Sequence, residues 1–186
     1  MRVIAGAFRG KKLSAPLDMV TRPTSDRVKE ALFSILASRI DFTGIRVLDI
    51  CAGTGALGIE ALSRGAGFCC FVESDRTVAA LLEKNIMAVN SKNNAEIVTM
   101  DAVKGVKSIA GRGVNFDLVF FDPPYDSDLY ARIPESLDAG ELLSSGAILV
   151  AECSARKPLP ELFGRLKRID RRVYGETALE LFAREE

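Results

Sequence analysis

The sequence predicts an α/β protein built on an open, mostly parallel β-sheet. From residue 45 to residue 153, short apolar runs alternate with amphipathic stretches, which is the pattern of parallel strands joined by crossover helices. After residue 164, two strand-like runs are separated only by Gly175 and Glu176. That spacing leaves no room for a helix and indicates a C-terminal antiparallel hairpin at one edge of the sheet. A chain of 186 residues suits one domain with a small extension.

The first 44 residues are expected to form that extension. The opening MRVIAGAFRGKKLSAP alternates only weakly and turns at Arg9-Gly10, which indicates a short hairpin or an irregular arm. Residues 22–40 predict a helix with Pro23 and Thr24 at its entry. Its apolar stripe at helical spacing consists of Val28, Ala31, Leu32, Ile35 and Leu36. We therefore divide the chain into a basic N-terminal arm and helix, residues 1–44, and a main domain, residues 45–186.

Five apolar runs of the main domain are expected to be strands buried on both faces. They cover residues 45–50, 68–74, 95–101, 116–122 and 147–153. The helices expected between them include residues 76–90 and 129–143. Ligands of open parallel sheets bind beyond the carboxyl ends of the strands. The residues that end these runs are therefore the first candidates for a functional site.

The charge of the chain is balanced overall but unevenly distributed. Residues 1–46 carry nine Lys or Arg against four Asp or Glu, and residues 156–172 carry seven against two. Residues 47–155 carry eight basic against fifteen acidic residues. Basic flanks around an acidic centre suit a polyanion held at the rim of a site that binds something else at its centre. Solvated surface charge accounts for the same counts equally well.

The composition excludes several kinds of chemistry. The chain has no histidine, so catalytic triads and general bases that depend on histidine are excluded, and metal binding is disfavoured. The four cysteines have no metal-binding spacing and are expected to be small buried hydrophobes: Cys51, Cys69, Cys70 and Cys153. No apolar run is long enough to cross a membrane and no signal-peptide pattern opens the chain, so we expect a cytoplasmic protein.

Three glycines directly after the first apolar run indicate a binding loop. In VLDICAGTGALGIEAL, Gly53, Gly55 and Gly58 match G-x-G-x-x-G at the start of a helix, where free backbone N–H groups face a ligand. Glu73 follows 20 residues after Gly53, at the end of the second run, where an acid can hold the hydroxyls of a ribose. An adenosine-containing cofactor is expected, although the same glycines could serve only a strand-to-helix turn.

Two further acids favour S-adenosylmethionine over NAD. Asp49 stands just before the glycines, where a carboxylate would repel the pyrophosphate of NAD but would attract the ammonium group of an amino-acid moiety. Asp101, at the end of the third run, is placed to accept a hydrogen bond from the amino group of adenine.

The fourth run ends in Asp122-Pro123-Pro124-Tyr125, which resembles the D-P-P-Y motif of amino-methyltransferases. Those enzymes methylate exocyclic nitrogens of bases or a glutamine amide. The resemblance implies that Asp122 and the Pro123 carbonyl accept the two N–H hydrogens of the target amino group, and that Tyr125 stacks on the base. By itself, the motif could also be a strand terminator followed by a surface tyrosine.

A closer resemblance covers nearly the whole chain. The segments RVIAGAFRGKKL, RPTSDRVKEALFSIL, VLDICAGTGALGIEALSRGA, FDLVFFDPPY and YGETALELF are similar to the bacterial RsmD-type family, which methylates guanine N2 of 16S ribosomal RNA. The resemblance implies a Rossmann-like class I S-adenosylmethionine-dependent methyltransferase with strand order 3-2-1-4-5-7-6 and a small N-terminal extension that helps to bind RNA. It also implies that the cofactor contacts Asp49, Gly53, Gly55, Glu73 and Asp101.

The expected substrate is 16S ribosomal RNA in a partly assembled small subunit, because a monomer of this size offers little surface for free RNA. The candidate phosphate contacts are Arg9, Lys11, Lys12, Arg22 and Arg27, each of which could equally be an ordinary surface residue. One alternative is a DNA adenine-N6 methyltransferase, which is disfavoured because no separate target-recognition domain fits in this length. The other is a non-catalytic nucleotide- or RNA-binding module, whose expected damage to residues 122–125 is not seen.

Overall fold

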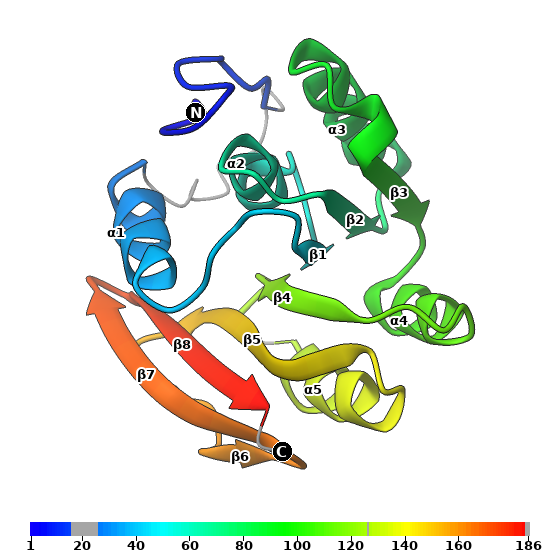
Figure 1. Ribbon diagram of the computed structural model, residues 1–186. Coiled ribbons are helices and arrows are strands. Elements are labelled where there is room, and N and C mark those ends of the chain that lie inside the picture. The colour runs from blue at the N-terminus through cyan, green and yellow to red at the C-terminus, as the bar shows by residue number, and fades with distance from the viewer. Residues whose placement is uncertain (16–25, 126, 185–186) are drawn as a thin grey trace.

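The computed structural model describes residues 1–15, 26–125 and 127–184 and centres on one twisted sheet (Figure 1). Within the described residues the strand order is β3-β2-β1-β4-β5-β8-β7-β6. The parallel strands are β1 (Arg46–Ile50), β2 (Phe68–Glu73), β3 (Ala95–Thr99), β4 (Phe116–Phe121) and β5 (Leu143–Ser154). The antiparallel strands are β6 (Leu162–Phe163), β7 (Leu166–Tyr174) and β8 (Thr177–Arg184). The predicted order is confirmed, because β7 and β8 occupy the places of the predicted sixth and seventh strands and only the two-residue β6 is added.

Helices cover both faces of the sheet, so the sheet divides the core into two layers. One face packs against α1 (Asp26–Ala37), α2 (Ala56–Ser63) and α3 (Arg76–Ala88), and the other against α4 (Ala102–Ala110) and α5 (Leu129–Ala139). A short 3-10 helix, η1 (Lys92–Asn94), precedes β3. No helix of the described segments combines the length and apolar character needed to cross a membrane.

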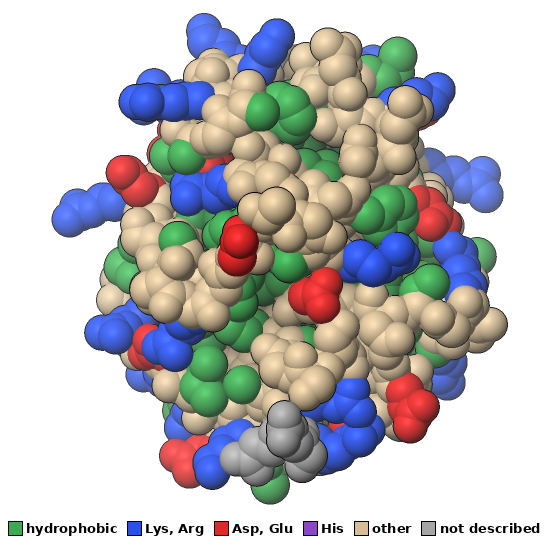
Figure 2. Space-filling view, viewed as in Figure 1, with side chains coloured by type: hydrophobic (Ala, Val, Ile, Leu, Met, Phe, Trp, Pro, Cys, Tyr) green, Lys and Arg blue, Asp and Glu red, His purple; other side chains and the backbone are tan. Residues whose placement is uncertain are grey.

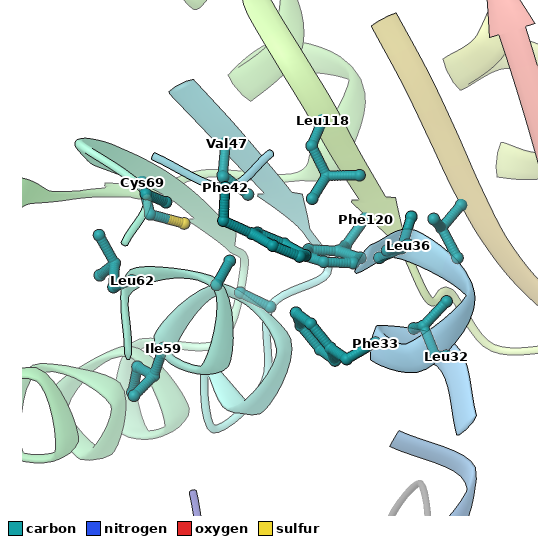
Figure 3. Close-up of a cluster of buried hydrophobic side chains, with 14 of the residues drawn as sticks. Leu32, Phe33, Leu36, Phe42, Val47, Ile59, Leu62, Cys69, Leu118 and Phe120 are labelled. Carbon is teal, nitrogen blue, oxygen red and sulfur yellow. The ribbon is translucent and has the colours of Figure 1, made fainter. Parts of the chain in front are cut away.

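Aromatic packing joins α1 to the central strands (Figure 3). The ring of Phe33 lies 5.7 Å from that of Phe42 and 5.6 Å from that of Phe120, measured between centroids. Phe33 is fully buried, together with Leu32 and Leu36 of the predicted stripe. These contacts hold the N-terminal helix firmly on the sheet, because burying a large aromatic side chain contributes about 2–3 kcal/mol. The predicted helix entry at Pro23 and Thr24 lies outside the described residues.

Two of the predictions for the main domain are wrong in part. Strand β3 is not buried on both faces, since only Val98 is buried there, because β3 is the edge strand of the sheet. The predicted helix over residues 129–143 ends at Ala139, since Gly140 caps it and Glu141 adopts a left-handed conformation with φ of 50°. The apolar residues that follow belong instead to β5, which pairs with β4 from residue 143 onward.

The N-terminal arm forms a short hairpin, one of the two forms that its sequence indicates, and is anchored by buried charge. Its strands meet at one antiparallel bridge between Arg2 and Lys12. Glu60 of α2 is fully buried and accepts hydrogen bonds from the backbone N–H groups of Ile4 at 2.8 Å and Ala5 at 3.0 Å. The ammonium group of Lys29 lies 3.3 Å from the same carboxylate and donates to the Arg2 carbonyl at 2.7 Å. The arm therefore depends on an ion pair that is sequestered from water.

We predict that Glu60→Gln lowers the free energy of unfolding by about 3 kcal/mol, because it leaves the buried Lys29 ammonium without its counter-charge. Chemical denaturation measures this loss, and proteolysis of the arm should accelerate with it. Glu161→Gln is the matched control, since the Glu161 side chain is 85% exposed in its pair with Arg168 and should change stability far less. Equal losses for the two variants would contradict the anchoring role of Glu60.

Candidate active site

The carboxyl ends of four strands bring acidic side chains to one edge of the sheet. Asp49 lies in β1, Glu73 ends β2, Asp122 directly follows β4, and Glu152 lies near the end of β5. The register pairs Phe121 with Ala151, so Asp122 and Glu152 are the next residues on neighbouring parallel strands. The edge is therefore acidic, as the charge distribution of the sequence predicts for the centre of a site.

The glycine loop between β1 and α2 is shaped by left-handed backbone conformations. Gly53 has φ of 55° and Gly55 has φ of 78°. A Cβ at Gly55 would lie 2.3 Å from Cδ1 of Leu82, so no larger residue fits there without movement. A Cβ at Gly53 would meet nothing within 4 Å, so the outer side of the loop is open. The loop can thus approach a ligand with its backbone, as the predicted cofactor site requires.

Glu73 and Asp49 support this loop from the sheet. Glu73 accepts a hydrogen bond from the Gly53 N–H at 2.9 Å and another from the Asp75 N–H at 2.9 Å. Asp49 is buried and accepts from the Gly58 N–H at 2.9 Å, at the start of α2. Burial raises the pKa of Asp49 to about 8, against the opposing effect of the Gly58 hydrogen bond. A cation bound at the loop would favour the charged form of this carboxylate.

The remaining predicted cofactor residue, Asp101, follows β3. It is exposed and caps α4 by accepting from the Lys104 N–H at 3.0 Å. That hydrogen bond, with help from the Lys104 ammonium group at 3.3 Å, lowers the pKa of Asp101. Cys51, half-buried between the acids, has its pKa raised to about 12 by burial and by Glu73, so its thiol stays neutral. The site offers carboxylate acceptors and backbone groups, which suit the ribose hydroxyls, the adenine amino group and the ammonium group of S-adenosylmethionine as hydrogen-bond donors.

Asp122, the first residue of the D-P-P-Y motif, is half-buried, and its carboxylate receives no hydrogen bond from any residue of the described segments. Burial raises the pKa of Asp122 well above its ordinary value, and the charges of Glu152 and Asp49 raise it further. An acceptor in such a place is free to bind the N–H groups of a substrate.

The rest of the motif is fixed by neighbours on other strands. The Tyr125 hydroxyl lies 2.7 Å from the Thr177 hydroxyl of β8 and donates weakly to Glu152 at 3.5 Å. Tyr130 of α5 donates to the Glu152 carbonyl at 2.8 Å and lies 3.3 Å from the Pro123 carbonyl. The Pro-Pro turn is therefore held between α5 and β5.

Two of these supporting residues were not found from the sequence. Glu152 ends a buried run, and the argument that identified Glu73 would have identified it too. Tyr130 had no such signal, because its contact with the motif depends on how α5 folds back over the sheet. Its buried hydroxyl has a pKa raised by desolvation and by the charge of Asp122, so it remains a hydrogen-bond donor.

The predicted RNA contacts that fall on described residues are exposed. Arg9, Lys11 and Lys12 are exposed on the arm and Arg27 is exposed on α1, while Arg22 lies outside the described residues. On the face shown in Figure 2, acidic side chains stand near the centre, and further acidic side chains lie among the Lys and Arg side chains toward the rim.

One asparagine connects the arm to the glycine loop. Asn85 of α3 accepts from the Ser14 N–H at 2.8 Å and donates to the Ser14 carbonyl at 3.0 Å. Its amide also donates to the Thr54 carbonyl at 2.9 Å. The end of the described arm is thereby fixed against the loop that the cofactor is expected to contact.

The parallel sheet, the open glycine loop and the acids at the strand ends define the class: a class I S-adenosylmethionine-dependent methyltransferase. Within this class the chain belongs to the RsmD-type family, whose model, described as "Conserved hypothetical protein 95", matches residues 1–183.

Relatives and solved structures agree with this membership. The chain is 35% identical to "Ribosomal RNA small subunit methyltransferase D" of Escherichia coli over 185 residues, which cover 100% of this chain and 90% of the relative. It is 38% identical to the protein of the same name from Haemophilus influenzae over 170 residues, which cover 90% of this chain and 86% of the relative. The structure described as "Putative methyltransferase yhhF from Escherichia coli" superposes with a TM-score of 0.86 at 34% identity, covering 100% of this chain and 98% of that one.

We predict that Glu73→Gln weakens the binding of S-adenosylhomocysteine by at least about tenfold, because a charge-assisted acceptor for hydroxyl groups is lost. Isothermal titration calorimetry measures the change. The control is Glu83→Gln, which alters an exposed acid on α3 and should leave the affinity unchanged. An unaltered affinity of the Glu73→Gln variant for S-adenosylhomocysteine would show that Glu73 does not bind the cofactor.

We predict that Asp49 makes the protein less stable as the pH rises. The folded chain keeps a proton on this carboxyl up to its pKa of about 8, whereas the unfolded chain releases it near a pKa of about 4. The stabilisation that the protonated Asp49 carboxyl provides is complete below the pKa of this group in the unfolded chain. It is lost as the pH rises through the folded-state pKa of about 8. Denaturation curves recorded at pH values between these two pKa values should show a smaller decline in the free energy of unfolding for Asp49→Asn than for the wild-type protein. Parallel pH profiles would contradict the shifted pKa.

Proposed function

We propose that this chain transfers a methyl group from S-adenosylmethionine to the exocyclic N2 of a guanine in 16S ribosomal RNA, within a partly assembled small subunit in the cytoplasm. The observation that carries the proposal is the half-buried Asp122 carboxylate, which has no hydrogen-bond donor among the described residues and is followed by a proline-fixed turn. The names of the relatives, ribosomal RNA small subunit methyltransferase D, support ribosomal RNA as the substrate.

The exocyclic nitrogen of guanine is a poor nucleophile, because its lone pair is delocalised into the ring. Asp122 and the Pro123 carbonyl accept its two hydrogens and turn the lone pair toward the methyl donor. The Pro123 carbonyl keeps acceptor capacity for this, since it has two lone pairs and the Tyr130 hydroxyl lies at a long 3.3 Å. Asp122 then takes up the proton that the methylated amino group releases, which suits a carboxyl with a raised pKa.

Tyr125 supplies a stacking surface for the base. Its hydroxyl is held by Thr177, so the ring has a fixed orientation before substrate arrives. A guanine in paired RNA hides its N2, and exposing it costs a few kcal/mol, of which stacking on an aromatic ring recovers about 1–3 kcal/mol.

S-adenosylmethionine supplies a methyl group on a cationic sulfonium, so no covalent intermediate with the protein is needed. Glu73 would hold the ribose, Asp101 the adenine amino group, and the backbone of Gly53 and Gly55 the body of the cofactor. Asp49 would act on the ammonium group through charge, since it is buried beneath the loop.

The protein would act as a monomer on the assembling particle. The exposed basic residues of its arm would bind RNA phosphates. Arg9, Lys11 and Lys12 project from a hairpin that Glu60 anchors, and Arg27 projects from α1. We include Arg22 in this group from the sequence alone. The surface is small for recognition of free RNA, which favours a particle in which proteins hold the RNA in shape.

We predict that Asp122→Ala lowers kcat at least about 100-fold while the affinity for S-adenosylhomocysteine stays within about twofold, because the nucleophile loses its orientation but the cofactor keeps its contacts. Asp117→Ala is the control. It removes an acid at the opposite end of the same strand, where Asp117 accepts from the Arg46 N–H at 2.8 Å. Full activity of Asp122→Ala would refute the assigned role.

The substrate itself is tested by mass spectrometry of 16S ribosomal RNA from cells with and without the gene. We expect one N2-methylguanine to be lost in cells without it, and purified protein to restore it on particles from those cells. Methylation of duplex DNA, with none of ribosomal RNA or particles, would overturn the proposal in favour of a DNA adenine-N6 enzyme. Cofactor binding without any methyl transfer would favour a non-catalytic module.

A further inference from the structure

A cavity of about 240 Å³ opens beside the D-P-P-Y turn and has no part in the chemistry described above. It lies between that turn, the first turn of α5 and the segment from Ser154 to Phe163 that leads from β5 into β6. Tyr125 is one of its walls, so the ring proposed to carry the target base also borders this second space.

The walls of the cavity are mainly aromatic and apolar, although Ser127, Asp128 and Ser154 also line it. The Asp128 carboxylate is paired with Arg132 at 2.9 Å. The hydroxyl of Tyr125 is bound to Thr177, and that of Tyr130 to the Glu152 carbonyl, so both rings are fixed by the sheet. Pro158 and Pro160 form part of the facing side. Flat apolar walls of this kind suit a planar ring system, because bases stack on aromatic and apolar side chains regardless of sequence.

The charge at the rim indicates what accompanies the ring. Many of the arginines between residues 156 and 172 are paired with acids, such as Arg168 and Arg171 with the buried Glu180. Lys157 is exposed at the cavity and forms no ion pair with any residue of the described segments. An unpaired ammonium group beside stacking walls is complementary to a nucleotide, with its base inside and its phosphate at the rim.

We propose that this cavity binds the base of a nucleotide directly next to the target guanine, with Lys157 on its phosphate. This inference rests on the proposed function. The Tyr125 ring borders both sites and so sets the distance between the two bases. The target guanine would lie on one side of the ring, and the neighbouring base of the same unpaired strand on the other. Stacking the neighbour here holds the strand open and keeps the target base out of a helix.

The test combines a filled cavity with an altered substrate. Ala131 of α5 lines the cavity and is exposed, so Ala131→Trp would fill the space without disturbing the core. We expect it to raise the KM for particles lacking the methyl group about tenfold, with unchanged affinity for S-adenosylhomocysteine. The matched control is Ala80→Trp, which fills a separate cavity between α3 and β3 and should leave the KM unchanged.

The altered substrate identifies the occupant. Small-subunit particles are reconstituted with 16S ribosomal RNA that carries an abasic nucleotide on either the 5′ or the 3′ side of the methylated guanine. One of the two should raise the KM of the wild-type protein about tenfold but have little further effect on Ala131→Trp, because both changes remove the same contact. Lys157→Ala should raise the KM for intact particles with kcat unchanged.

Each other result overturns the inference. A normal KM for Ala131→Trp would mean that the cavity takes no part in substrate binding. A raised KM for Ala131→Trp without an effect of either abasic substitution would mean that the cavity holds another group, such as a protein side chain of the particle. Failure of the wild-type protein to methylate intact particles would instead refute the proposed function, so the two failures are distinguishable.

Discussion

The site depends on two carboxylates of the sheet that accept hydrogen bonds from the backbone of the glycine loop. Glu73 binds the Gly53 N–H and Asp49 binds the Gly58 N–H, so both ends of the loop are fixed to neighbouring strands. The left-handed conformations of the loop are held in this way, and its open side remains available to a ligand. Through Asn85, the same loop is linked to the N-terminal arm. The glycine loop, the arm and the sheet therefore form one connected unit.

The acidic carboxyl edge of the sheet sets the electrostatic character of the candidate site. Acids gather at the carboxyl edge, where burial and mutual repulsion raise the pKa of Asp122 and of Asp49. Such an edge attracts a cationic methyl donor and repels the phosphates of RNA. Lysines and arginines are exposed on the arm and elsewhere on the surface, where some of them pair with acids. The net charge of zero hides this local concentration of acids.

Strand positions and the glycine loop could be predicted because their signals are carried by neighbouring residues. Apolar runs and punctuating glycines are local, and four of the five predicted strands are indeed buried along most of their length. The exceptions arise where context outweighs the pattern. Strand β3 is partly exposed because it lies at the edge of the sheet. The turn at Glu141 ends the predicted helix early, and β5 begins within the range predicted to be helical.

The sequence alone predicted the fold class, the strand order through its family resemblance, the acids near the strand ends and the two prolines after β4, since consecutive residues carry that information. Only the tertiary structure decided what holds these groups in place. Glu60 anchors the arm across 56 residues, Asn85 binds Ser14 across 71, and Tyr130 reaches the Glu152 carbonyl across 22. Such contacts have no local pattern, because they form between side chains and backbone groups that meet only when the layers pack. The cavity beside Tyr125 arises in the same way, from three segments that are separate in the chain.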